Sequence, residues 1–180
     1  MRRGEPLGLR WRDVDLDAAT ITVRRSAGLI QVAGQGKTVT EGPTKTGKPR
    51  VIDLDPATVA VLREHKRDRG GLNLILARDD QLVFGDINGQ HRHPERFSHT
   101  WQQIVARAIG DGIEVPPIRL HDLRHGHATI LLLAGVPVHV VSQRLGHASP
   151  VVTMTVYAHV LPASQREAAN LFAQLIGKAA

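Results

Sequence analysis

The sequence lacks several features that would assign it to large classes of protein. It contains no cysteine, so disulfide bonds and thiolate metal sites are excluded, and a cytoplasmic protein is expected. Aromatic residues make up only 3% of the chain, which argues against a platform on which the bases of single-stranded nucleic acid stack. The longest apolar run, residues 130–134, is much shorter than the roughly 20 residues that cross a membrane. The first residues also lack the apolar stretch of a signal peptide, so we expect no membrane segment.

Positive charge is what the sequence has in excess. Lysine and arginine number 23 against 17 acidic residues, which gives a formal charge of +6, and there are ten histidines. A basic balance of this kind favours a polyanionic partner such as nucleic acid. Because aromatic residues are scarce, we expect arginine and lysine side chains to contact the phosphate backbone.

The residue patterns predict one domain with an α+β fold, mostly helical, with a small antiparallel sheet near the N-terminus. The length of 180 residues and the apolar content of 42% suit a single domain with a real core. Runs of β-branched residues between Gly- and Lys-rich turns predict strands, while capping residues, Pro and Gly mark the helix ends. The predicted strands are 20–25, 38–40, 51–54 and 82–84, after a short helical end within 7–17; the predicted helices are 55–69, 98–109, 122–134, 138–145 and 150–157.

The C-terminal segment predicts an amphipathic helix. Ser164 and Glu167 have the spacing of a capping box, and apolar residues follow at helical spacing: Ala168, Leu171, Phe172, Leu175 and Ile176. Such a face needs a partner, which is either the core of the same chain or a neighbouring protomer.

A concentration of reactive side chains lies near the end of the chain. His121 and Arg124 are three residues apart at a predicted helix start, so they share one face, and the helix N-terminus adds positive potential that favours an anion. His147 follows a helix-ending glycine, in a turn where its ring is expected to point into a cleft. Tyr157, the only tyrosine in the chain, is expected to swing toward the same cleft. This set supplies a nucleophile, cations and proton carriers for cleaving a phosphodiester without a metal.

Other interpretations of these segments are weaker or remain as alternatives. A metal site of His121, His125 and His127 is disfavoured because the rings lie on different helix faces and no carboxylates complete it; we expect His125 and His127 to pack or form hydrogen bonds. Residues 42–48 have P-loop spacing, but Pro49 replaces the required Ser or Thr. Residues 130–147 are compatible with a helix-turn-helix, which would make the protein a DNA-binding module without catalytic chemistry.

The motifs together resemble the catalytic domain of the tyrosine recombinases, the phage-integrase family. The resemblance covers nearly the whole chain, and the closing histidine and tyrosine motifs are its most specific part. Type IB topoisomerases use the same chemistry, but the spacing from Leu-Gly-His to tyrosine favours a recombinase. The matching segments are Arg2–Asp15 for the first arginine motif, Thr44–Gly47 for the β-hairpin lysine, His121–His125 for the His-x-x-Arg motif, Leu145–His147 for the final histidine, and Tyr157–Val160 for the nucleophile.

The resemblance implies a mechanism for site-specific DNA recombination or integration. Tyr157 would attack a DNA phosphate to give a 3′-phosphotyrosyl link, while Arg2 and Arg124 hold the phosphate oxygens. The resemblance further implies that His121 assists proton transfer and that Lys45, for which Lys37 and Lys48 are alternatives, protonates the leaving 5′-oxygen. The remaining expected site residue, His147, would donate a hydrogen bond to the phosphate. No cofactor or metal is expected, and the partners would be double-stranded DNA and further protomers, in a tetramer that exchanges C-terminal helices.

The start of the chain departs from the family pattern. The resemblance implies helices before the first arginine motif and an N-terminal core-binding domain, whereas this sequence begins one residue before Arg2. We therefore expect residues 1–180 to be a catalytic domain that lacks both, with Arg2 poorly held at a frayed terminus and with reduced activity in isolation.

Overall fold

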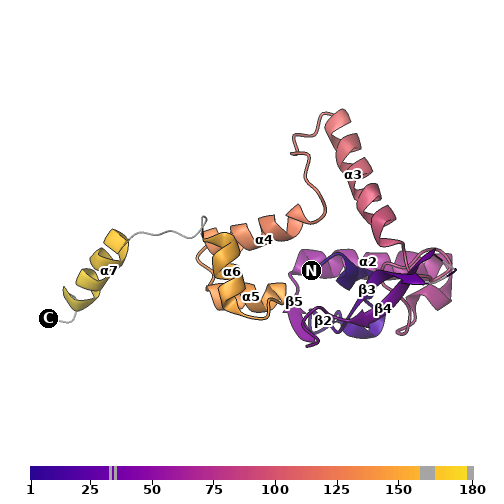
Figure 1. Cartoon of the computed structure of the whole chain (residues 1–180), viewed down its shortest axis with the longest axis horizontal. Coiled ribbons are helices and arrows are strands. Elements are labelled where there is room, and N and C mark those ends of the chain that lie inside the picture. Colours follow the sequence, from indigo (N-terminus) through magenta and orange to yellow (C-terminus); the bar gives the residue numbers. More distant parts are fainter. Residues whose placement is uncertain (33, 35, 159–164, 178–180) are drawn as a thin grey trace.

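The computed structural model describes residues 1–32, 34, 36–158 and 165–177. Figure 1 shows an N-terminal part of strands and helices, a group of helices labelled α4, α5 and α6 beside it, and the helix α7, which stands apart. The observed architecture is α+β and mostly helical, as predicted. Within the described residues, none of the helices combines the length and apolarity that a membrane span requires.

The strands form two antiparallel sheets rather than the single small sheet expected. Strands β1 (Val14–Asp15), β2 (Thr20–Val23) and β5 (Arg50–Asp53) form one sheet in the order β1-β2-β5. Strands β3 (Arg25–Val32) and β4 (Gly36–Pro43) form the other, paired from Arg25↔Pro43 to Val32↔Gly36. The chain leaves the first sheet after β2, makes this long hairpin, and returns to pair β5 with β2.

The first core packs the three-stranded sheet against α2 (Pro56–Leu72), which contributes Leu62. Asp55 caps α2 by accepting a hydrogen bond from the Thr58 N–H at 3.0 Å, as the Asp-Pro pair predicts. Short helical turns precede and follow: α1 (Gly4–Leu7), η1 (Trp11–Asp13) and η2 (Leu74–Ala77). The buried residues of this core are Leu9, Trp11, Ile21, Val23, Ile52, Leu62 and Val83.

Residues 82–84 were predicted as a strand, and that prediction is wrong. Only a single bridge joins Leu82 to Arg10, and Val83, fully buried, belongs to the core. The apolar run therefore reflects burial in a loop rather than membership of a sheet. Periodicity alone cannot separate the two in a run this short.

The second core belongs to α4 (Asp122–Leu133), α5 (Val138–Leu145) and α6 (Pro150–Tyr157). It contains Ala128, Leu132, Val141, Leu145 and Tyr157. Segment 150–157 is helical, as predicted, although its β-branched residues are poor helix formers, because Ser149 caps it by accepting from the Val151 N–H at 3.1 Å. The preceding helix α3 (Pro94–Gly110) begins four residues earlier than expected, with Pro94 in its first turn.

The terminal helix α7 (Gln165–Gly177) is present, as predicted. In Figure 1 it stands away from the other helices, and Phe172, Leu175 and Ile176 are 55–66% exposed. The expected capping box of Ser164 and Glu167 lies outside the residues and side chains that the structure describes.

Candidate active site

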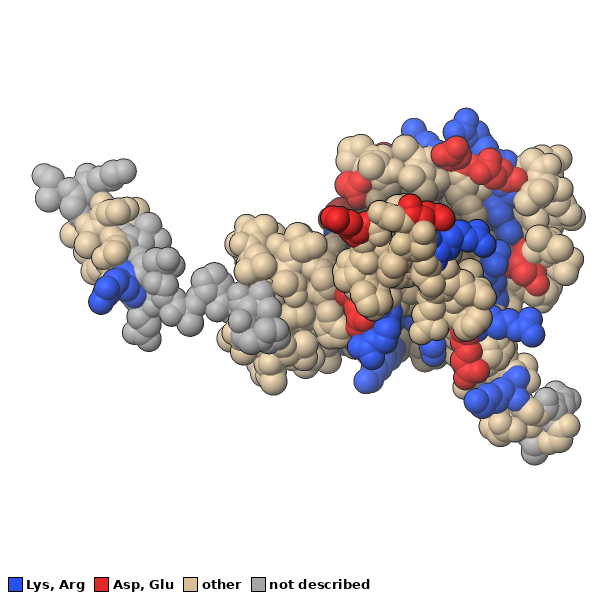
Figure 2. Space-filling view, turned by 90° about the horizontal axis from the view of Figure 1, so that it is seen from above, with Lys and Arg blue, Asp and Glu red and all other residues tan. Residues whose placement is uncertain are grey.

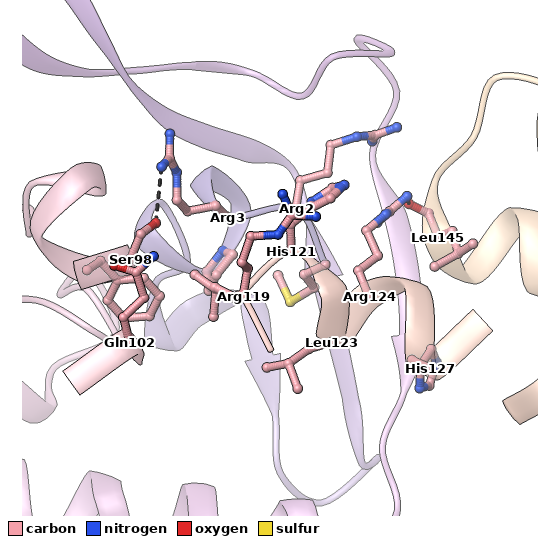
Figure 3. A pocket seen from close by; sticks show the side chains of 14 residues that line it. Arg2, Arg3, Ser98, Gln102, Arg119, His121, Leu123, Arg124, His127 and Leu145 are labelled. Carbon is pink, nitrogen blue, oxygen red and sulfur yellow. Dashed lines mark hydrogen bonds between the residues drawn. The ribbon is translucent and has the colours of Figure 1, made fainter. Parts of the chain in front are cut away.

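A cleft of about 660 Å³ lies where α1, α3 and α4 meet. His121 and Arg124 both line it, so they share one face at the start of α4, as predicted. Arg2 enters the same cleft from the other end of the chain (Figure 3). Arg3 also lines the cleft and donates to Ser98 Oγ at 3.1 Å, which ties α1 to α3. The cleft thus gathers guanidinium and imidazole groups from segments more than 110 residues apart.

The C-terminus of α5 anchors three arginines by their hydrogen bonds. The carbonyls of its last two residues and of the capping Gly146 each accept from a different guanidinium, which satisfies acceptors that a helix end leaves open and places positive charge at the negative end of the helix dipole. The bonds run from Arg50 Nε to Arg144 O (3.3 Å), from Arg124 Nη2 to Leu145 O (2.6 Å) and from Arg2 Nη1 to Gly146 O (3.1 Å).

Glu5 holds Arg2 in place, so the expectation of a poorly held Arg2 is wrong. This carboxylate is buried, accepts from Arg50 Nη1 and Nη2 at 3.0 and 2.7 Å, and accepts from the Arg2 backbone N–H at 2.6 Å. Burial by itself raises the pKa of Glu5, but these hydrogen bonds outweigh it and keep the pKa below its usual value. Sequence reasoning missed Glu5 and Arg50. The spacing of three residues from Arg2 to Glu5 was a local clue, whereas nothing local pointed to Arg50.

Arg124 is the most buried cation of the cleft, with 7% of its surface exposed. Burial, and next the neighbouring Arg2, lower its pKa to about 10, so it stays charged at neutral pH. Its Nη2 binds the Leu145 carbonyl, while its buried Nη1 has no hydrogen-bond partner among the described residues. A buried, unpaired charged donor is costly. An anion in the cleft would supply the missing acceptor, and a phosphate oxygen has the right chemistry.

His147 is held more tightly than the sequence suggested. Its ring is half-buried, and Nδ1 lies 2.7 Å from Thr153 Oγ1 on α6, so the ring is not free to turn. Burial, then the charges of Arg124 and Arg2, lower the pKa of His147 to about 4, so the ring is neutral at pH 7. If Thr153 donates to Nδ1, the ring proton lies on Nε2, where it can be donated to an anion.

Tyr157 is buried at the end of α6, and its hydroxyl lies 3.0 Å from His125 Nδ1. Its side chain is not among those that line the cleft. Burial raises the pKa of Tyr157, while the charge of Arg124 acts in the opposite direction. The expectation that His125 forms a hydrogen bond is confirmed, and its partner is Tyr157.

Lys45 lies outside the β3–β4 hairpin, whereas the resemblance implied a lysine on a β-hairpin. The hairpin pairs β3 with β4, whereas Lys45 is in the turn that follows β4 and leads to β5. That turn is closed by a bond from the Gly47 N–H to Thr44 O at 2.8 Å, and the Lys45 side chain is exposed. The alternative Lys37 pairs with Glu95 at 3.5 Å. Neither lysine is among the residues that line the cleft.

The charged side chains that line the cleft are cations. Glu5 is the buried carboxylate that offsets the charge of Arg2, Arg50 and Arg124. Among the residues that the structure describes, no three His, Asp or Glu side chains gather in an arrangement that could hold a metal ion. The arrangement therefore suits an anion.

Gly146 offers a test of how the arginines are positioned. It ends α5 with φ of +69°, and an added Cβ would lie 2.7 Å from the guanidinium of Arg50. We expect Gly146→Ala to lower the free energy of unfolding by roughly 2–4 kcal/mol, from left-handed strain plus displacement of Arg50 from Glu5. Urea unfolding measures this loss.

Gly135 is the matched control for that substitution. It also has positive φ, of +81°, but nothing lies within 4 Å of an added Cβ. Gly135→Ala should cost only the backbone strain, about 1–2 kcal/mol. Equal losses in the two variants would contradict a packing role for Gly146 against Arg50.

Comparison with known proteins assigns the chain to a family. The sequence profile of the phage integrase family matches residues 1–164, so the chain belongs to that family. It is 27% identical over 179 residues to a XerC-like tyrosine recombinase of Caldanaerobacter subterraneus subsp. tengcongensis, covering 93% of this chain and 44% of the relative. It is also 27% identical over 184 residues to the ICEBs1 integrase of Bacillus subtilis, covering 98% and 46%. The chain thus spans less than half the length of these relatives.

Solved structures show the same fold. The Tn1549 transposon integrase, in complex with circular intermediate DNA, superposes with a TM-score of 0.73 at 20% identity, covering 98% of this chain and 56% of that one. XerA recombinase superposes with a TM-score of 0.61 at 22% identity, covering 96% and 52%. The two-sheet, multi-helix architecture described above is therefore that of the tyrosine recombinase catalytic domain.

Proposed function

We propose that this chain is the catalytic domain of a site-specific DNA recombinase or integrase, which cleaves and rejoins DNA through a 3′-phosphotyrosyl intermediate. The observation that carries the proposal is the unpaired Nη1 of buried Arg124, in a cleft that Arg2 and His121 also line. A phosphodiester fits this donor, and the sole tyrosine of the chain ends the helix that packs on the same α5.

In the proposed reaction, cationic side chains contact the phosphate where negative charge develops. Tyr157 attacks the scissile phosphate, and Arg2 and Arg124 hold the non-bridging oxygens as negative charge grows in the transition state. His147, neutral and fixed by Thr153, donates a hydrogen bond to the same phosphate.

Proton carriers complete the step. His121 assists proton transfer in the cleft, and Lys45, from its exposed turn, protonates the 5′-oxygen that leaves. The phosphotyrosine retains the energy of the broken bond, so a 5′-hydroxyl from another strand can reverse the step and exchange the strands. The proposed reaction needs neither ATP nor a cofactor.

Double-stranded DNA is the proposed partner, and the cytoplasm is the proposed place of action. The net charge of +6 favours a phosphate backbone, and the Tn1549 integrase that shares the fold is described in complex with its transposon DNA. The relatives are about twice as long as this chain, so we propose that residues 1–180 act as one domain of such an enzyme.

A nicked suicide substrate tests the function. In such a duplex the short 5′-terminated strand diffuses away after cleavage, so the covalent intermediate accumulates. We expect a protein–DNA adduct that survives SDS and forms equally in EDTA. A shift of duplex DNA on a native gel without any adduct would instead support a non-catalytic helix-turn-helix module.

Self-association on DNA is a further part of the proposal. Phe172, Leu175 and Ile176 of α7 are exposed, and Figure 2 shows that the neighbouring lobe of α5 and α6 carries few charged side chains on the face in view. On α6, Val151, Val152, Met154 and Val156 are also exposed. We propose that α7 docks on a neighbouring protomer, in a tetramer assembled on DNA.

Removing the terminal helix should weaken that assembly. We expect deletion of residues 164–180 to reduce multimers on DNA at least tenfold in sedimentation experiments, because it removes the apolar face of α7. Phe172→Glu with Ile176→Glu should act in the same way, whereas Gln174→Ala, an exposed polar position on that helix, should leave assembly unchanged. Unaltered assembly after the deletion would argue for packing of α7 within its own chain.

A further inference from the structure

The hydroxyl of Tyr157 contacts a histidine other than the one that the sequence motif suggests for proton transfer. His125 Nδ1 lies 3.0 Å from Tyr157 Oη, a normal distance for a hydrogen bond between a hydroxyl and a ring nitrogen. The two ring centroids are 5.8 Å apart. His121, by contrast, lines the cleft of the arginines.

The geometry of α4 explains this division. His121 and His125 are four residues apart, so their rings lie on the same helix face, with centroids 4.9 Å apart in an edge-to-face arrangement. Arg124 points instead to the Leu145 carbonyl. The three rings therefore form a row from the cleft to the nucleophile, in the order His121, His125, Tyr157.

The surroundings of Tyr157 create the need for a base. Its side chain is 4% exposed, and burial raises its pKa above the ordinary value, so the phenol is protonated at neutral pH. A neutral phenol is a weak nucleophile, and a base within hydrogen-bond reach of the proton activates it. His125 is within that reach. It is also exposed, so a proton that it receives can pass to solvent.

We propose that His125 is a catalytic residue, the base that accepts the hydroxyl proton of Tyr157 as this tyrosine attacks the DNA phosphate. The inference rests on the function proposed above and assigns one step of it. His121 then acts on the cleft side, one ring further from the nucleophile.

The step balances without a further reactant. The O–H bond of Tyr157 breaks and its proton goes to Nδ1 of a neutral His125 that carries its other proton on Nε2. The bond from Oη to phosphorus forms, and the bond from phosphorus to the 5′-oxygen breaks, with the electron pair leaving on that oxygen, which Lys45 protonates. In the reverse step, His125 returns a proton to the phenolate oxygen.

Three variants of the full 180-residue chain test the assignment on the suicide substrate. We expect His125→Ala to slow adduct formation about 100- to 10,000-fold, the range that a general base contributes. His125→Asn retains an amide near the position of Nδ1 but cannot take up a proton at neutral pH, so it should be comparably slow. His139→Ala, at an exposed position on α5, should react at the wild-type rate.

A second substrate separates the nucleophile from the leaving group. When sulfur replaces the bridging 5′-oxygen, the leaving thiolate needs no proton, because a thiol has a pKa near 8.5. His125→Ala should remain as slow on this substrate, whereas Lys45→Ala should recover. Recovery of His125→Ala would assign it to the leaving group, and a wild-type rate for His125→Asn would reduce it to a positioning role; either overturns the proposal.

The sole tyrosine permits a measurement that does not depend on activity. Absorbance of the phenolate reports the ionisation of Tyr157 alone, since the chain has no other tyrosine. A hydrogen bond from the phenol to His125 stabilises the neutral phenol, so His125→Ala should move this ionisation to lower pH, and His139→Ala should not. An unmoved midpoint would overturn the contact. Absence of adduct from the wild-type chain, on the other hand, would refute the proposed function itself.

Discussion

Tyr157→Phe should abolish the covalent adduct, because it removes the oxygen that becomes bonded to phosphorus. The chain has no second tyrosine that could substitute for it. Phenylalanine keeps the aromatic ring in the second core, where Tyr157 packs with Leu132 and Leu145, so the fold should be retained. The substitution removes the hydrogen bond to His125, and this loss should lower the free energy of unfolding by only about 1 kcal/mol. Denaturing gels of labelled suicide substrate measure the adduct.

Two controls define what loss of the adduct means. The affinity of Tyr157→Phe for duplex DNA should stay within about twofold of wild type, and urea unfolding should remain cooperative with a slightly lower midpoint. An adduct that persists in Tyr157→Phe would identify another nucleophile and would exclude the proposed role of Tyr157.

Arg124→Lys should slow adduct formation about 100- to 1000-fold, the usual consequence of losing a preorganised donor to a developing oxyanion. Lysine keeps the positive charge but not the planar fork that binds Leu145 O with one nitrogen and leaves another for the phosphate. Single-turnover kinetics on the suicide substrate measure the rate.

Arg119→Lys is the matched control. Arg119 lines the same cleft, but it is exposed and paired with Asp122 at 2.9 Å. We expect less than a tenfold change in rate for this variant, together with a modest loss of DNA affinity. If both substitutions slow the reaction equally, Arg124 has no special position in the cleft; if neither slows it, the cleft acts through its summed charge, which lysine preserves.

Local signals in the sequence predicted the helices well. Gly135 and Gly146 take positive φ after α4 and α5, and Asp55 and Ser149 cap the helices that follow them. Each signal acts over a few residues, because helix capping and a left-handed backbone conformation depend on the residues next to the helix end. The motif residues His121 and Arg124 were also expected on one face, since their spacing fixes this once the helix is known.

Several contacts between distant segments could not be predicted from local signals. The ion pair of Glu5 with Arg50 joins residues 45 apart, and the contact of Tyr157 with His125 joins residues 32 apart. The division of the strands into two sheets depends on where the chain turns after β2. The Lys45 turn lies between two strands as predicted, but those strands belong to different sheets, because Gly- and Lys-rich sequence marks a turn without showing whether the strands beside it pair with each other.

The C-terminal end of α5 positions several residues to which we assign roles in the reaction. The carbonyls of its last two residues and of the capping Gly146 bind Arg50, Arg124 and Arg2, and His147 follows directly. A single helix terminus thus sets the positions of two proposed phosphate-binding arginines and one proposed hydrogen-bond donor. Substitutions that disturb this terminus should therefore reduce stability and reaction rate together.

The chemical identity of the protein–DNA link is the most direct test of the proposed function. The adduct from the suicide substrate can be digested with protease and nuclease and then analysed by mass spectrometry. The account predicts a peptide that contains Tyr157 joined to a nucleotide through the 3′-phosphate, with a free hydroxyl on the 5′ end of the released strand. A nucleotide joined through its 5′-phosphate, or attached to any other residue, would contradict it.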